Sequence, residues 1–261
     1  MNLYLKKFYN AVKDPSWPDV DTYVDFYRLP KKIKLECEHI HKASQRLQEI
    51  ESHSFMAGLH TVFQKNKLSY VPLPKCGSVY YTEVFKSWLA WPQVTLQKAV
   101  QESKPFGFIV DPSSRWIRGL TQWVWQIQEN SDFISIDEFL KKVVFSKKFP
   151  LVPISNQTTS YHDLLGSYID QIHWIPMDWL GPEKTQEELL RFMQTQDSSV
   201  PISFHENFRI IAPPLKKLQL FEKIKTLHFQ QMEQNENYIW SWHRTFAQDL
   251  KFYRKIIETF Q

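Results

Sequence analysis

The chain has 261 residues, of which 43% are hydrophobic and 15% aromatic. These fractions allow a sizeable core and exclude an intrinsically disordered chain. The formal net charge of +4 suits an anionic ligand, but it is far from the basic density of a dedicated nucleic-acid binder. A chain of this length can form one large α/β domain or two small ones. Because no internal repeat or interdomain linker is evident, we expect a single α/β domain over residues 1–261, and we expect no nucleic-acid binding.

Cysteine content and apolar runs bear on the setting of the protein. Cys37 and Cys76 are the two cysteines and stand in unrelated contexts, so neither a disulfide framework nor a metal site is expected. The first residues, MNLYLKKFYN, lack the apolar run of a signal peptide, and no apolar run has membrane-spanning length. We expect a cytoplasmic, soluble protein without a membrane contact.

Residues 1–65 are predicted to form a helical segment that packs on the rest of the domain. Pro15, Pro18 and Pro30 interrupt its first half. Apolar residues at helical spacing then run from about Ile33 to Gln64.

The stretch from Leu68 to Ala90 is the one around which we interpret the rest of the chain. An apolar run, LSYVPL, predicts a strand, and PKCGS a turn; Tyr80, Val84 and Trp88, spaced four apart, then predict a helix. A strand that enters a glycine-containing turn and then a helix presents backbone N–H groups to a phosphate. Lysine in the turn adds a positive charge, although the GxxxxGK[ST] spacing of a Walker A loop is absent.

A second strand-to-helix turn follows. Phe106–Val110 predicts a buried strand, and Asp111 with Pro112 is a strong helix-start signal. The helix that follows carries Arg115 and Arg118 in its first turns. Two such turns in one sheet favour a doubly wound architecture, in which ligand groups gather at the carboxyl ends of the strands.

The other segments carry weaker signals. The segment from Pro92 to Lys104 shows no strong pattern. The remaining predicted elements are helices over 134–145, 161–168, 215–229 and 236–259, a capped helix that begins at Thr185, and strands over 171–176 and 208–211.

Three motifs and the ending of the chain, in this order, resemble the sulfotransferase superfamily, particularly its carbohydrate-type branch. Pro74–Ser78, PKCGS, is similar to the family's 5′-phosphosulfate loop, and Phe108–Gly119 resembles its RDPxxRxxS segment for the 3′-phosphate. His173–Met177 resembles its HWxPQ element, and Phe246–Tyr253 its Y-x-x-D closing helix. The resemblance covers about residues 66–254 and implies a P-loop-type sandwich, with a short central parallel sheet flanked by many helices.

The resemblance also implies an activity and a site. It implies transfer of a sulfonate from 3′-phosphoadenosine 5′-phosphosulfate to a hydroxyl acceptor, in this branch a carbohydrate, without a metal. Lys75 would stabilise the leaving oxygen as a catalytic residue. The donor-binding positions would be Lys75, Cys76, Gly77, Ser78, Val79, Tyr80, Arg115 and Arg118.

The chain departs from the family pattern at three positions. Val110 stands where the family has the Arg of RDP, Arg118 where it has the motif's Ser, and Met177 where it has Gln. Our hypothesis is that Arg118 supplies the missing charge from the helix. The alternatives are that donor binding is weakened or that the donor is a different one.

The general base is open between Glu83, on the helix of the loop, and His173, in the third motif. Each also has a structural interpretation, as a solvated surface carboxylate and as a packed histidine. A catalytically inactive binding protein with an altered 3′-phosphate site is the second hypothesis for the whole chain. A P-loop-type phosphotransferase is a weaker third, because a Mg²⁺-binding carboxylate is not evident.

Overall fold

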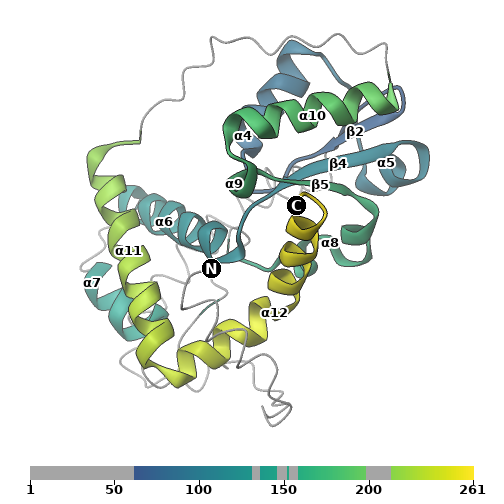
Figure 1. The fold of residues 1–261 in the computed structure, drawn as a ribbon. Coiled ribbons are helices and arrows are strands. Elements are labelled where there is room, and N and C mark those ends of the chain that lie inside the picture. Colours follow the sequence, from purple (N-terminus) through teal and green to yellow (C-terminus); the bar gives the residue numbers. More distant parts are fainter. Residues whose placement is uncertain (1–61, 131–135, 146–151, 153–157, 198–212) are drawn as a thin grey trace. The chain divides into compact units, whose positions relative to one another are not determined.

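The computed structural model describes residues 62–130, 136–145, 152, 158–197 and 213–261 (Figure 1). They divide into two compact units. The sheet unit contains residues 62–115, 160–197, 213 and 249–261, and the helical unit contains 116–130, 136–145, 152, 158–159 and 214–248. The boundaries fall within helices α6 (Pro112–Asn130) and α12 (Glu236–Glu258). The single domain over residues 1–261 stays a prediction.

The sheet unit is built on a five-stranded sheet with the order β3-β1-β2-β4-β5. The strands are β1 (Val62–Lys65), β2 (Leu68–Val71), β3 (Gln93–Val94), β4 (Lys104–Ile109) and β5 (His173–Pro176). Strands β2, β4 and β5 are parallel, whereas β1 is antiparallel to both β2 and β3. The α/β class with a parallel centre is thus confirmed, but the antiparallel strand β1 makes the sheet mixed and not a purely parallel doubly wound one.

The connections that follow the neighbouring strands β2 and β4 run in opposite directions. After β2 the chain crosses to β3, beyond β1, whereas after β4 it continues to β5 on the opposite side. Loops that leave neighbouring parallel strands in opposite directions open a crevice at the carboxyl ends of those strands, which is where open α/β sheets bind ligands.

The prediction that the N-terminal helical segment extends to Gln64 is wrong at its end. Residues 62–65 form β1, which pairs with β2 so that Phe63 lies opposite Tyr70. Both side chains are buried, and this cross-strand pairing outweighs the local helix-like spacing. The rest of the predicted segment, residues 1–61, lies outside the described residues.

Helices cover both faces of the sheet within its unit. They are α4 (Ser78–Glu83), the π-helical η3 (Val84–Trp88), α5 (Leu96–Glu102), α8 (Tyr161–Leu165), the 3₁₀-helical η5 (Gly166–Gln171), α9 (Met177–Leu180) and α10 (Pro182–Gln196). In Figure 1, α4 and α10 lie on one side of the strands, and α8 lies on the other with the C-terminal turns of α12.

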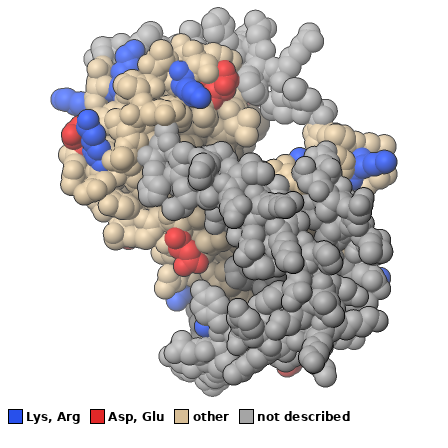
Figure 2. All heavy atoms as spheres, turned by 180° about the vertical axis from the view of Figure 1, so that it is seen from behind, with Lys and Arg blue, Asp and Glu red and all other residues tan. Residues whose placement is uncertain are grey.

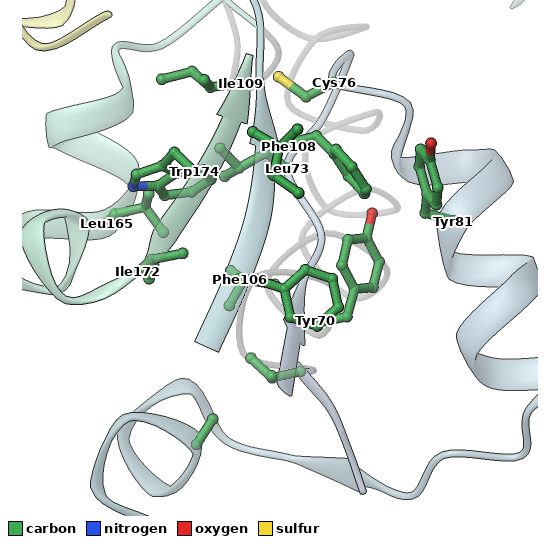
Figure 3. Close-up of a cluster of buried hydrophobic side chains, with 14 of the residues drawn as sticks. Tyr70, Leu73, Cys76, Tyr81, Phe106, Phe108, Ile109, Leu165, Ile172 and Trp174 are labelled. Carbon is green, nitrogen blue, oxygen red and sulfur yellow. The ribbon is translucent and has the colours of Figure 1, made fainter. Parts of the chain in front are cut away.

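Aromatic side chains fill the space between the sheet and α4. The ring of Tyr70 lies 4.7 Å from that of Phe85, and Phe108 stacks on Tyr81 at 3.9 Å. Figure 3 shows Tyr81 on one side of β4 and Trp174 on the other. Burial of each such side chain stabilises the fold by roughly 2–3 kcal/mol, so both faces of β4 hold the strand in place.

Several predicted boundaries shift for local reasons. The helix predicted from Thr185 begins at Pro182, since proline suits the first helical position. The strand predicted from 171 begins at His173, because η5 occupies residues 166–171. The patternless stretch contains β3 and α5, the latter capped by the Thr95 hydroxyl, which accepts from the Lys98 N–H at 3.2 Å.

The helical unit packs around buried aromatic rings. Its described elements are α6 from residue 116, α7 (Ile136–Phe139), the π-helical η4 (Leu140–Val144), α11 (Leu215–Gln234) and α12 up to residue 248. The rings of Trp116 and Trp242 meet edge to face at 5.2 Å. The predicted helices over 134–145, 215–229 and 236–259 are thus found with shifted ends, and the predicted strand over 208–211 lies outside the described residues.

Candidate anion-binding site

Three polar segments follow the three parallel strands of the sheet unit. The turn Pro74–Gly77 follows β2, Asp111 follows β4, and Asp178 follows β5. Since β2, β4 and β5 are parallel neighbours, these segments leave the same edge of the sheet. This edge is where the sequence predicts an anion site.

The turn after β2 has an unusual backbone. Lys75 and Gly77 both adopt left-handed conformations, with φ of 65° and 72°. The Cys76 N–H donates to the Leu73 carbonyl at 3.2 Å, and the first helical bond runs from the Tyr81 N–H to the Gly77 carbonyl at 3.1 Å. The N–H groups of residues 78–80 precede this bond, and such groups are the usual anion donors of a helix start.

Gly77 is required by its conformation and by its neighbour. A Cβ at this position would lie 2.9 Å from Met177 Cε, at an unfavourable positive φ. Met177, which stands where the family pattern has Gln, therefore packs directly on the turn. The third motif and the first motif are in contact, although the contact is apolar.

Two buried side chains, Arg115 and Tyr161, contact the turn. Arg115 is 1% exposed, and its Nε donates to the Pro74 carbonyl at 3.2 Å. The Tyr161 hydroxyl lies 3.5 Å from Cys76 Sγ, and its ring lies 4.8 Å from the Arg115 guanidinium. Burial raises the pKa of Cys76, so its thiol stays protonated and serves as a packing group.

The position where the family pattern has arginine is part of the core. Val110 is 1% exposed, and its backbone N–H and carbonyl both bond to the Tyr161 hydroxyl, at 3.3 and 2.8 Å. A charged side chain here would be buried at a large cost. In this chain the Tyr161 hydroxyl therefore satisfies both backbone groups of the residue that follows β4.

A carboxylate in the interior of α12 fixes Tyr161 in turn. Asp249, 1% exposed, accepts from the Tyr161 N–H at 2.6 Å and from the His162 N–H at 3.2 Å. Its Oδ1 also lies 2.6 Å from His162 Nδ1, and this bond raises the pKa of His162. The closing helix predicted from the resemblance is therefore joined to α8.

Asp111 and Asp178 are joined through the backbone of Asp111. Asp178 accepts from the Asp111 N–H at 2.7 Å and from the Tyr253 hydroxyl at 2.6 Å, while Asp111 accepts from the Ser114 N–H at 2.9 Å. Burial raises the pKa of Asp111 to about 6, and Asp178 adds to the rise. Burial raises the pKa of Tyr253, and the carboxylates of Asp178 and Asp111 raise it further, so these three groups lie in one cluster.

The two residues predicted as general base lie in different settings. His173 begins β5 opposite Phe106, three residues before the end of the paired strands, or about 10 Å along them. Its ring stacks on Phe192 of α10 at 4.2 Å, and burial lowers its pKa. Glu83 is exposed at the end of α4. The assignment of either residue as general base stays a prediction.

The two arginines of the second motif, three residues apart on α6, differ in burial. Arg115 belongs to the sheet unit and is buried, whereas Arg118 is exposed on α6 and belongs to the helical unit. Their predicted convergence on one phosphate stays a prediction. At the turn itself, Lys75, Ser78 and Tyr80 are half-buried and Val79 is 82% exposed.

The charged surface shown in Figure 2 is mixed. Among its described residues, Asp and Glu side chains lie between and beside the Lys and Arg side chains. Within the described ranges, no group of three or more His, Cys, Asp or Glu side chains could hold a metal ion. No helix in that part of the chain is long and apolar enough to cross a bilayer.

Sequence analysis missed the role of Asp178 and of Tyr161. The signal for Asp178 was its position, since an aspartate directly follows a strand region here as at Asp111. Tyr161 carried no local signal. Comparison with family models, curated proteins and solved structures found no match for this chain.

Proposed function

We propose that the chain is a P-loop-type sulfotransferase that moves a sulfonate from 3′-phosphoadenosine 5′-phosphosulfate to a hydroxyl, on a carbohydrate acceptor, in the cytoplasm. The observation that carries the proposal is the left-handed Pro74–Gly77 turn between the carboxyl end of β2 and α4. It combines helix-start N–H groups with Lys75 at a divergence of the sheet connections.

The proposed chemistry assigns each group a task. The N–H groups of residues 77–80 bind the anionic oxygens, and Lys75 neutralises the charge that develops on the phosphate leaving group. The oxygen of the acceptor hydroxyl attacks sulfur, and the bond from sulfur to the phosphate oxygen breaks. Asp111 takes the proton that the acceptor hydroxyl loses in this step. With a pKa of about 6, Asp111 is ionised at neutral pH and basic enough to accept a proton.

Nucleotide binding tests the proposal. Wild-type protein is expected to bind 3′-phosphoadenosine 5′-phosphate in the micromolar range by titration calorimetry, and Lys75→Ala to lose this binding. With donor and acceptor present, Lys75→Ala is expected to lower kcat about 10²- to 10³-fold. Lys86→Ala removes an exposed lysine of η3 and serves as the matched control. Absence of binding at millimolar nucleotide would refute the proposal.

Asp111→Asn tests the assignment of the base. In the wild type, kcat/KM is expected to rise with pH up to about 6 and then level off, because only ionised Asp111 accepts the proton. The variant is expected to lose this dependence and about 10²- to 10⁴-fold in kcat, with nucleotide affinity retained. Glu83→Gln and His173→Gln are the controls. A pH limb that disappears in either control instead would return the role to that residue.

A second candidate is a catalytically inactive binding protein of the same fold. It is favoured by the second motif, in which Val110 is buried and Arg115 is engaged with Pro74 and Tyr161. Nucleotide binding separates the two, and Arg118→Ala tests whether the altered motif recognises the 3′-phosphate. A larger loss of affinity for the 3′-phosphorylated nucleotide than for its 3′-hydroxyl analogue supports this role of Arg118, and equal losses refute it.

A further inference from the structure

Tyr161 is a fully buried side chain whose hydroxyl lies where two elements of the candidate site meet. It is 0% exposed and stands in the first turn of α8. The hydroxyl donates to the Val110 carbonyl at 2.8 Å, accepts from the Val110 N–H at 3.3 Å, and lies 3.5 Å from Cys76 Sγ. One phenol therefore joins the end of β4 to the turn after β2.

The other end of this residue is also fixed. The Tyr161 N–H donates to the buried Asp249 carboxylate at 2.6 Å. The face of its ring lies 4.8 Å from the Arg115 guanidinium, whose Nε holds the Pro74 carbonyl. A cation over an aromatic face is attracted to it, so Tyr161 also orients the arginine that holds the start of the turn.

These contacts flank the one strained residue of the turn. Lys75 adopts a φ of 65°, which a residue with a side chain seldom adopts. Such a conformation persists only where the surroundings hold it. Its preceding neighbour, Pro74, is held by Arg115, and its following neighbour, Cys76, lies against the Tyr161 hydroxyl.

We propose that Tyr161 is a positioning residue for the turn: its hydroxyl and ring hold Pro74–Ser78 in the conformation that binds an anion. The inference rests on the proposed function in taking this anion to be the 5′-phosphosulfate of the donor. Tyr161 itself touches no reacting atom and acts through Cys76 and Arg115. Removal of its hydroxyl releases the turn, while the sheet and helices keep their packing.

A matched control is present in the helical unit. Tyr238 is also 0% exposed, and its hydroxyl is bonded, at 2.8 Å from His228 Nδ1. Tyr161→Phe and Tyr238→Phe thus remove the same atom from equally buried sites. A role confined to folding would make the two variants behave alike at the turn.

The experiment measures amide hydrogen exchange over residues 72–84, together with the affinity for inorganic sulfate and for 3′-phosphoadenosine 5′-phosphate. Tyr161→Phe is expected to speed exchange in this segment about tenfold and to weaken sulfate binding about tenfold. Tyr238→Phe is expected to lower the free energy of unfolding without either change. Should Tyr161→Phe fail to fold, Cys76→Ala removes the same contact from the side of the turn and has the same expected effect.

The outcomes separate the inference from the proposed function. Equal exchange over residues 72–84 in Tyr161→Phe and Tyr238→Phe overturns the positioning role, whatever the nucleotide result. Faster exchange and weaker sulfate binding in Tyr161→Phe support it. If the wild type then binds sulfate and no nucleotide, the positioning role stands and the sulfotransferase proposal fails.

Discussion

The two compact units each contain a hydrogen-bonded, fully buried tyrosine, but the two hydrogen-bond networks end differently. The Tyr238 hydroxyl meets His228, whose ring lies 5.2 Å from Trp116 and 4.7 Å from Trp242. The Tyr161 hydroxyl meets Val110 and Cys76, next to a strained turn. The first tyrosine lies within an aromatic core, and the second lies beneath a turn with a backbone conformation that needs support.

This difference indicates where stability and function are concentrated. A buried hydroxyl among aromatic rings contributes to the packing and uniqueness of a core. The buried hydroxyl of Tyr161, in contrast, helps to hold the turn in which Lys75 adopts a positive φ, a conformation that a residue with a side chain seldom adopts. We therefore expect changes in the helical unit to lower stability and changes around Tyr161 to alter the turn.

The largest expected effect is that of Trp116→Ala. Trp116 is 0% exposed, and its Nε1 donates to the Val152 carbonyl at 2.8 Å. Its loss leaves a cavity and an unpaired carbonyl, so we expect the free energy of unfolding in urea to fall by about 3–5 kcal/mol. Under native conditions the exchange of residues 72–84 should stay at the wild-type rate. An increase there equal to that of Tyr161→Phe would break the comparison.

A smaller effect is expected from acid on the helical unit. Burial lowers the pKa of His228 to about 3, whereas an unfolded histidine titrates near 6.5. Between these values the unfolded chain binds one more proton, so stability falls as the pH drops, by about 1.4 kcal/mol per pH unit. Urea unfolding at pH 6.5 and 5 should show a loss of about 2 kcal/mol from this group. His228→Gln should remove that loss. If the free energy of unfolding of the variant depends on pH as strongly as that of the wild type, the loss does not come from His228.

The smallest expected effect is that of His162, and it has the opposite sign. The bond to Asp249 raises its pKa, with smaller contributions from Asp170 and Asp163. Its stabilisation is complete below the unfolded value near 6.5 and is lost as the pH rises through the higher folded value. The ring is 29% exposed, so solvent weakens the contribution. An NMR titration should give a midpoint above 6.5 that returns toward it in Asp249→Asn, and a midpoint below 6.5 would contradict the bond.

Local patterns predicted the elements that position the site. The apolar runs at Leu68 and Phe106 predicted β2 and β4, and the Asp111-Pro112 signal predicted the start of α6. They predicted the turn at Pro74–Ser78 as well. These features depend on residues within about ten positions of one another, where periodicity and turn chemistry act. The same patterns missed β1 and α5, whose formation depends on pairing with β2 or on a single cap.

The chemistry gathered around the turn was decided by tertiary structure. Tyr161 and Asp249 are 88 residues apart in sequence, and Asp111 and Asp178 are 67 apart. No local pattern links such residues, because their contact depends on which strands pair and which helix ends reach them. The position of His173 also depended on tertiary structure. The motif around it was visible in the sequence, but the register of β5 with β4 places it away from the carboxyl ends of the strands. Its ring stacks there on Phe192. By itself the sequence determined a strand, a basic glycine-containing turn and a helix; packing decided which side chains hold that turn.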